Sequence, residues 1–305
     1  MKFFVTGVCG QLGHDIMNEL AKRGHEGVGS DIFETYSGVQ DGSAVTTMPY
    51  AQLDITDPEA VKKVISDAKP DAVIHCAAWT AVDLAEDEDK KDKVRAINAG
   101  GTENIAKACR DQDIKMTYIS TDYVFNGQGE EPWQPDCKDY APLNHYGQTK
   151  LEGELAVSSI LEKFFIVRIA WVFGLNGKNF IKTMLNLGKT HDTLRVVCDQ
   201  IGTPTYTYDL ARLLVDMNET EKYGYYHATN EGGYISWYDF TCEIMKQAGY
   251  TNVNVIPVTT AEYGLSKAAR PFNSRLDKSK LVENGFTPLP TWQDALSRYL
   301  KEIKE

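Results

Sequence analysis

The fold of this chain is decided by KFFVTGVCGQLG at residues 2–13, where a short apolar run leads into three glycines. Gly7, Gly10 and Gly13 form the pattern G-x-x-G-x-x-G between a β-rich segment and an amphipathic helix. Glycines here let a pyrophosphate approach the backbone, and a helix N-terminus adds N–H donors and partial positive charge. The segment therefore predicts a dinucleotide-binding site on the first strand–helix unit.

Short β-rich segments continue to alternate with longer helical patterns over the first half of the chain. Besides a strand before Asp54, the expected strands are Lys2–Thr6, His25–Ser30, Ala72–Cys76, Met116–Ser120 and Phe164–Ile169. The expected helices are Leu12–Arg23, Asp54–Lys69 (capped by Asp57, with Pro58 at its first position), Asp89–Cys109 and Tyr146–Ser159. This alternation predicts the α/β class, with a doubly wound parallel Rossmann sheet covered on both faces.

The pattern loosens after Trp171, which suggests a second, smaller region. We expect residues 1–172 to form an NAD(P)-binding Rossmann domain, joined by about 196–220. Residues 173–305 are expected to be mostly a smaller C-terminal substrate-binding region, with Tyr223–Tyr226 as packing aromatics. The polar, turn-rich segment Phe33–Pro49 reads as an insertion and a mobile surface loop.

Composition and charge exclude several classes of protein. The chain has 305 residues, 42% hydrophobic and 25% charged, which is typical of a globular protein. Its formal net charge of −11 disfavours nucleic acid or an anionic membrane as the main partner. No run approaches the roughly 18 apolar residues of a membrane helix. The six cysteines include no C-x-x-C pair, so we expect reduced thiols in a cytoplasmic protein. We expect the protein to be a monomer or a homodimer.

Several residues at predicted strand ends suit a nicotinamide dinucleotide. Asp31 ends the second strand, where a carboxylate binds the adenosine ribose hydroxyls and repels a 2′-phosphate, which favours NAD over NADP. Asp54 and Ile55 follow the third strand, where the aspartate reaches toward the adenine amino group. Ala77 and Ala78 end the fourth strand, and their small size lets a cofactor lie against the backbone.

Tyr146 and Lys150 stand at i and i+4 on one face of a predicted helix. A tyrosine with its ordinary pKa near 10 is a sluggish proton donor at neutral pH. A lysine ammonium one turn away stabilises the phenolate and lowers that pKa, and it can also hold the nicotinamide ribose. Thr121 ends a preceding strand, where its hydroxyl can polarise a substrate carbonyl. The three residues predict a carbonyl-reducing site.

Taken together, these motifs resemble the extended short-chain dehydrogenases/reductases along almost the whole chain. The likeness is carried by GVCGQLG (7–13), CAAWTAVDLAE (76–86), INAGGTENIA (97–106), STDYVFNG (120–127), YGQTKLEGE (146–154), RIAWVFG (168–174), DQIGTPT (199–205) and ARPFNSRL (269–276). It is strongest to members that use NAD(P)H to reduce the C4 ketone of dTDP-4-dehydro-L-rhamnose to dTDP-L-rhamnose.

The resemblance implies a role for each matching residue. Thr121, Tyr146 and Lys150 would be the catalytic triad, with Tyr146 protonating O4. Cofactor contacts would come from Gly10, Gln11, Leu12, Asp31, Asp54, Ile55, Ala78, Trp79 and Thr80. The sugar nucleotide would touch Asp122 and Trp171, and by looser similarity Asn179 and Arg270 would hold its pyrophosphate.

Two alternative functions remain open at this point. An epimerase or 4,6-dehydratase shares the fold, but such dehydratases usually carry a glutamate where this chain has Tyr123. A non-catalytic regulatory subunit, like that of methionine adenosyltransferase, would not need the triad. Some relatives form magnesium-bridged dimers; Asp15 suits such a site, but Tyr208 replaces the expected second acid, so no metal is predicted. Ala170 also replaces a frequent hydroxyl residue.

Overall fold

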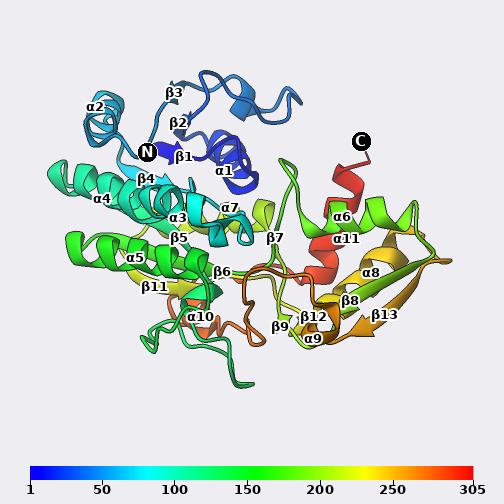
Figure 1. Cartoon of the computed structure of the whole chain (residues 1–305). Coiled ribbons are helices and arrows are strands. Elements are labelled where there is room, and N and C mark those ends of the chain that lie inside the picture. The colour runs from blue at the N-terminus through cyan, green and yellow to red at the C-terminus, as the bar shows by residue number, and fades with distance from the viewer. Residues whose placement is uncertain (305) are drawn as a thin grey trace.

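The computed structural model describes residues 1–304, and its centre is a seven-stranded sheet (Figure 1). All pairs are parallel, in the order β11–β6–β5–β4–β1–β2–β3, so the predicted doubly wound sheet is confirmed. The order reverses between β1 and β4, which is where such sheets bind ligands at their carboxyl ends. The strands are β1 (Lys2–Thr6), β2 (Glu26–Asp31), β3 (Tyr50–Gln52), β4 (Ala72–His75), β5 (Lys115–Thr121), β6 (Phe164–Ile169) and β11 (Gly224–His227).

Helices cover both faces because successive strand residues point in opposite directions. Phe3 packs into one apolar core, beneath α1 (Gln11–Lys22) and α7 (Thr207–Asn218). Phe4 packs into the other core, beneath α2 (Pro58–Ala68), α4 (Thr102–Asp111) and α5 (His145–Ile160). The shorter α10 (Ser279–Glu283) packs beside β11, although it lies near the end of the sequence.

A second group of elements forms what we call the C-terminal lobe, to one side of the sheet (Figure 1). Its helices are α6 (Phe180–Gly188), α8 (Trp237–Ala248), α9 (Thr260–Tyr263) and α11 (Trp292–Glu302). Its parallel strand pair is β8 (Thr193–Val197) with β13 (Asn254–Val258). Two short pairs lie between it and the sheet: β7 (Val172–Phe173) with β10 (Thr205–Tyr206), and β9 (Ile201–Gly202) with β12 (Ile235–Ser236). The division at residues 172 and 173 stays a prediction.

The helix expected at Asp89–Cys109 is not continuous. It consists of α3 (Glu88–Arg95), a π-helical segment η3 (Ala96–Gly101) and then α4. Within η3, Asn98 is 1% exposed, and its side chain donates to the Trp79 carbonyl and the Thr149 hydroxyl at 3.2 and 3.1 Å. Asn98 lies in this wider turn, and its buried amide joins η3 to the segment after β4 and to α5.

Of two other predictions about local structure, one is confirmed and one is wrong. The Asp57 side chain accepts hydrogen bonds from two backbone amides at the start of α2, as predicted for a capped helix. The interpretation of Tyr223–Tyr226 as part of the second region is wrong, because β11 pairs with β6 at the edge of the main sheet. The stretch is too short and too rich in tyrosine to be distinguished from loop aromatics.

The insertion at 33–49 contains one 3₁₀ turn, η1 (Ala44–Thr46), and packs on α1. Val45 is 5% exposed, and its amide donates to the Asn18 side chain at 2.9 Å. The Tyr36 hydroxyl lies 2.7 Å from the His14 ring. These contacts attach the segment to the Rossmann core, which the polar composition alone did not indicate.

A wholly buried ion pair joins α5 to β6. The guanidinium of Arg168 makes two hydrogen bonds of 2.8 Å to Glu154, and both side chains are 0% exposed. The same guanidinium donates to the Pro135 carbonyl and the Tyr140 hydroxyl at 3.0 and 3.1 Å. It therefore fixes the segment before α5 as well as the helix itself.

Removing one partner of this pair should be costly, because the other charge stays buried without compensation. We expect Arg168→Met to lower the free energy of unfolding by about 3–5 kcal/mol. The double variant Arg168→Met/Glu154→Met should recover much of that loss, since no charge then remains buried. Urea unfolding followed by circular dichroism measures both. Equal losses in the single and double variants would contradict this account.

Candidate functional site

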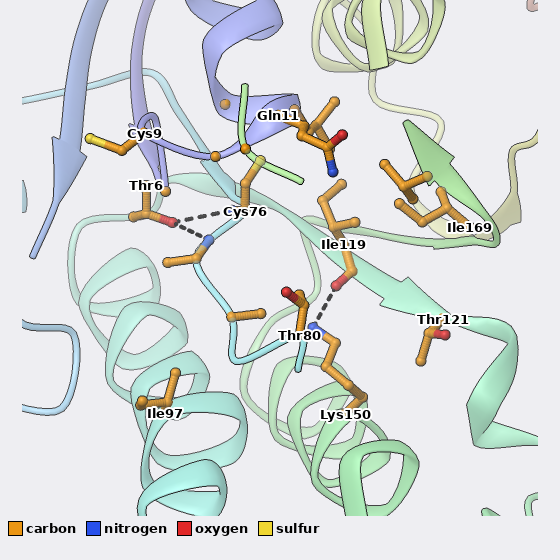
Figure 2. Close-up of a pocket in the computed structure, with 18 of the residues that line it drawn as sticks. Thr6, Cys9, Gln11, Cys76, Thr80, Ile97, Ile119, Thr121, Lys150 and Ile169 are labelled. Atoms are coloured by element: carbon orange, nitrogen blue, oxygen red, sulfur yellow. Dashed lines mark hydrogen bonds between the residues drawn. The ribbon is translucent and has the colours of Figure 1, made fainter. Parts of the chain in front are cut away.

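A cavity of about 750 Å³ lies at the carboxyl ends of the sheet strands, between the sheet and the C-terminal lobe. Its volume is within the range of small-molecule sites. It is lined by the ends of β1, β2, β4, β5 and β6, by α1 and α5, and by residues of the C-terminal lobe. Figure 2 shows part of this lining, with Gln11 at one side and Lys150 at the other.

The glycine loop forms one wall, and each glycine has a local reason. Gly7 has φ +72°, and a Cβ there would lie 2.7 Å from the backbone nitrogen of Ala77. A Cβ on Gly13 would overlap the backbone of the same loop. Gly10 is the N-cap of α1, and no side chain caps that helix. The free N–H groups of Gln11 and Leu12 make this end suited to an anion.

Two acidic residues mark the end of the cavity at β2 and β3. Asp31 accepts hydrogen bonds from the amides of Cys9 and Ile32 at 3.0 and 2.8 Å, so its carboxylate is held beside the glycine loop. Asp54 accepts from the amide and the hydroxyl of Thr56 at 2.9 and 2.7 Å. Both carboxylates and Ile55 line the cavity, at the end where the adenosine was expected.

Thr6 holds the floor of the cavity together, a role that the sequence did not reveal. Its hydroxyl accepts from the amides of Cys76 and Ala77, both at 3.1 Å, which joins β1 to the end of β4 (Figure 2). It also lies 2.7 Å from a ring nitrogen of His75. Burial lowers the pKa of His75 to about 3, so the imidazole is neutral and its role is structural. Ala77 and Ala78 then leave the floor open to a ligand.

Thr121, Asp122 and Tyr146 meet at the opposite end. Asn144 caps α5 through the amide of Gly147 at 2.8 Å, which sets Tyr146 in the first helical turn. The Thr121 hydroxyl donates to Asp122 at 3.0 Å, and both residues are at most 5% exposed. Burial raises the pKa of Asp122 to about 6.

The pKa of Tyr146 is raised well above 10, the direction opposite to the one expected from the sequence. Burial is the main cause, the carboxylate of Asp122 adds to it, and the Thr121 hydroxyl opposes it. Lys150 makes no hydrogen bond to Tyr146. Its ammonium donates to the Ile119 carbonyl at 2.7 Å (Figure 2). It also lies 4.1 Å from the centre of the Tyr118 ring. Burial lowers the pKa of Lys150 to about 7, so its charge is only partial at neutral pH.

Two stacked indoles form the wall toward the C-terminal lobe. Trp171 and Trp237 lie 3.7 Å apart between ring centres, at 16°. Trp171 has φ +51°, a left-handed conformation that a bulky residue rarely adopts. Both rings line the cavity. Trp171 was expected at the site, whereas Trp237 was not identified, because nothing in the sequence distinguishes it from a packing residue after the helix cap Ser236.

Three expected site residues do not line the cavity. The Trp79 indole donates to the Ala81 carbonyl at 3.1 Å. Asn179 caps α6, and its amide donates to Gln11, Gly174 and Tyr299. Arg270 makes a two-pronged ion pair with Asp83 at 3.0 and 2.7 Å. Each side chain is satisfied within the protein, so their binding roles stay predictions. Thr80, in contrast, lines the cavity.

Within residues 1–304, no group of three or more His, Cys, Asp and Glu residues could hold a metal ion. Asp15 is 6% exposed and accepts a hydrogen bond from Thr207, and burial raises its pKa to about 7. Tyr208 is 47% exposed. In the same residues, no helix is long and apolar enough to cross a membrane.

Comparison with known proteins identifies relatives along the whole chain. The model of the family described as "RmlD substrate binding domain" matches residues 1–305. The dTDP-4-dehydrorhamnose reductase of Streptomyces griseus is 37% identical over 97% of this chain and 92% of its own length. Two crystal structures of proteins with that name are similar: that from Clostridium acetobutylicum (TM-score 0.89, 40% identity, 100% of both chains) and that from Bacillus anthracis in complex with NADP (TM-score 0.87, 38% identity, 99% of both chains).

The lowered pKa of Lys150 predicts a pH-dependent stability. Below about pH 7 the folded protein carries a buried charge, whereas between about pH 7 and 10.5 it has lost that proton and the unfolded chain keeps it. The free energy of unfolding should therefore rise with pH across this window, by roughly 1–4 kcal/mol more than in Lys150→Met. Urea unfolding of both proteins at about pH 6 and about pH 9 measures the difference. If the free energy of unfolding changed equally with pH in both proteins, the lowered pKa of Lys150 would be contradicted.

Proposed function

Because this chain belongs to the family described as the RmlD substrate binding domain, we propose that it reduces the C4 ketone of dTDP-4-dehydro-L-rhamnose to dTDP-L-rhamnose. It is an NAD(P)-dependent oxidoreductase acting on a sugar nucleotide. One observation supports this best: the glycine loop and the three residues Thr121, Tyr146 and Lys150 line a single cavity. The cofactor would lie between them, along Gly10, Gln11, Leu12, Ala78 and Thr80.

We infer a division of labour among the residues at the reacting end. When bound, reduced nicotinamide supplies the hydride that C4 accepts. Tyr146 delivers the proton to O4, and its raised pKa keeps the phenol protonated until that moment. Thr121 would turn its hydroxyl from Asp122 to donate a hydrogen bond to the same oxygen, where negative charge develops. Lys150 holds the nicotinamide ribose and stabilises the phenolate once the proton has left.

The sugar and its diphosphate would occupy the end of the cavity near the indole pair. Asp122 is buried there and one of its oxygens makes no hydrogen bond, so it can accept one from a sugar hydroxyl. Trp171 presents an apolar ring face to the same space. Arg270 would reach the diphosphate only after leaving Asp83, and Asn179 would have to exchange one of its hydrogen bonds within the protein.

The alternatives receive less support. Tyr123 stands where a 4,6-dehydratase would need a carboxylate, and a tyrosine buried beside Tyr146 cannot take that role. A non-catalytic regulatory subunit would have no need for Thr121, Tyr146 and Lys150 in one cavity. Since all six cysteines are free thiols, we propose a cytoplasmic enzyme. We also propose that it is a monomer or a homodimer.

We propose that NADH is preferred over NADPH. Asp31 is fixed beside the glycine loop, where its charge opposes a 2′-phosphate. Residues 32–49, which follow it, contain no lysine or arginine to neutralise such a group. The Bacillus anthracis relative was crystallised with NADP, so the preference would be a property of this chain's own residues.

The function is tested by mixing the protein with dTDP-4-dehydro-L-rhamnose and following the absorbance of NADH or NADPH. We expect oxidation of the cofactor, and Tyr146→Phe should lower kcat by about 10²–10⁴ because the proton donor is lost. The affinity for NADH should be unchanged. A folded wild-type protein that oxidises neither cofactor would exclude the reductase function, and a fully active Tyr146→Phe would exclude Tyr146 as donor.

Replacing the carboxylate should relax the cofactor preference. We expect Asp31→Ala to shift the ratio of kcat/KM for NADPH over NADH by about tenfold toward NADPH, since a repulsion is removed. Asp54→Ala, at the adenine side, is the matched control and should leave the ratio near that of the wild type. An unchanged ratio in Asp31→Ala would show that other groups set the preference.

A further inference from the structure

The loop at residues 174–178, between β7 and α6, contacts the glycine loop and contributes Gly177 and Lys178 to the cavity wall. Figure 1 shows the chain rising between β7 and α6 toward the side of α1. Asn176 in this loop is 1% exposed. Its amide nitrogen lies 3.4 Å from the carbonyls of both Cys9 and Gly10, and its oxygen accepts from the Val39 amide at 2.8 Å. One buried side chain thus joins the lobe, the glycine loop and the insertion.

A second contact fixes the other end of the loop. Asn179 donates to the side chain of Gln11 at 3.1 Å and to the carbonyl of Gly174 at 3.0 Å. Between the two asparagines, Gly177 has φ +68°. Lys178 follows this turn, is exposed, and lines the same cavity as Gly10 and Gln11 at the start of α1.

The charges in the cavity single out Lys178. The lining contains three carboxylates, Asp31, Asp54 and Asp122, but only two cations, Lys150 and Lys178. Lys150 is already bonded to the Ile119 carbonyl, and its lowered pKa leaves it partly neutral. Within residues 1–304, Lys178 makes no hydrogen bond through its side chain and no ion pair, although it lines the same cavity as the uncapped N-terminus of α1.

We propose that Lys178 binds the pyrophosphate of the nicotinamide dinucleotide from the C-terminal lobe, opposite the helix N-terminus, and that Asn176 positions it. The inference rests on the proposed function, since it needs a dinucleotide in this cavity. A doubly charged pyrophosphate is then held between the partial positive charge of α1 and one full positive charge.

The position of the loop favours this phosphate group over the two others that could be present. The loop contacts Gly10 and Gln11, the residues at the mouth of α1, through Asn176 and Asn179. A 2′-phosphate would instead lie at the adenosine end, beside Asp31. The substrate diphosphate would lie toward Arg270, which does not line the cavity.

The test measures the affinity of Lys178→Met for NADH, NADPH and ADP-ribose, which carries the pyrophosphate without nicotinamide. We expect the Kd of all three to rise by about tenfold, with Lys178→Arg close to wild type. Lys189→Met is the matched control, because Lys189 is an exposed lysine of the same lobe outside the cavity. The KM for the sugar nucleotide at saturating cofactor should not change.

The other outcomes are distinct. Weakening of NADPH alone would place Lys178 at the 2′-phosphate, and a raised KM for the sugar nucleotide alone would place it at the substrate. Either result, or no change at all, overturns the proposal. If the wild-type protein binds no dinucleotide, the proposed function itself fails, which the NADH titration of the wild type reveals first.

The positioning role of Asn176 is tested by a double-mutant cycle in proteins that retain the wild-type circular dichroism spectrum. With Asn176→Ala already present, Lys178→Met should raise the Kd of ADP-ribose by much less than in the wild-type background. An unchanged factor would show that Lys178 reaches the pyrophosphate without this anchor.

Discussion

The ion pair between Arg168 and Glu154 is the contact on which the geometry of the site depends. Tyr146, Lys150 and Glu154 follow one another at intervals of four residues on α5, so they share one face of the helix. Glu154 is tied to β6, whose end leads directly into the cavity wall at Ala170 and Trp171. Rotation of the helix would break a buried charge pair, and this cost keeps the proton donor and the ammonium facing the strand ends.

Burial in the site favours the uncharged forms of the reactive side chains. Burial raises the pKa of Tyr146 and of Asp122 and lowers that of Lys150, so each is pushed toward its uncharged form. A dinucleotide and a sugar nucleotide bring negative charge to this space. The ammonium form of Lys150 then becomes favourable, and with it the stabilisation of a phenolate. The sequence-based expectation that Lys150 lowers the pKa of Tyr146 is wrong for this structure, because burial and Asp122 raise that pKa.

The sequence predicted what depends on local patterns. The strand–glycine–helix unit, the capped start of α2 and the parallel sheet follow from spacing and turn chemistry. The contacts of Asn176 and Trp237 did not, because their partners lie far away in the chain. The π-helical segment that contains Asn98 interrupts a predicted helix. The periodicity of the sequence does not reveal the buried contact that Asn98 makes there. The resemblance suggested that Arg270 binds the pyrophosphate of the sugar nucleotide, whereas in the folded chain its guanidinium forms an ion pair with Asp83.

The stacked pair of Trp171 and Trp237 also gives the protein an intrinsic spectroscopic signal from the site. These are the two of five tryptophans whose rings line the cavity, and they come from the sheet and from the C-terminal lobe. Closely stacked indoles couple their excited states, and indole emission overlaps the absorption of reduced nicotinamide. Energy transfer from this pair would report the arrival of the cofactor, and the chiral coupling between the rings would report any change in how the lobe sits on the sheet.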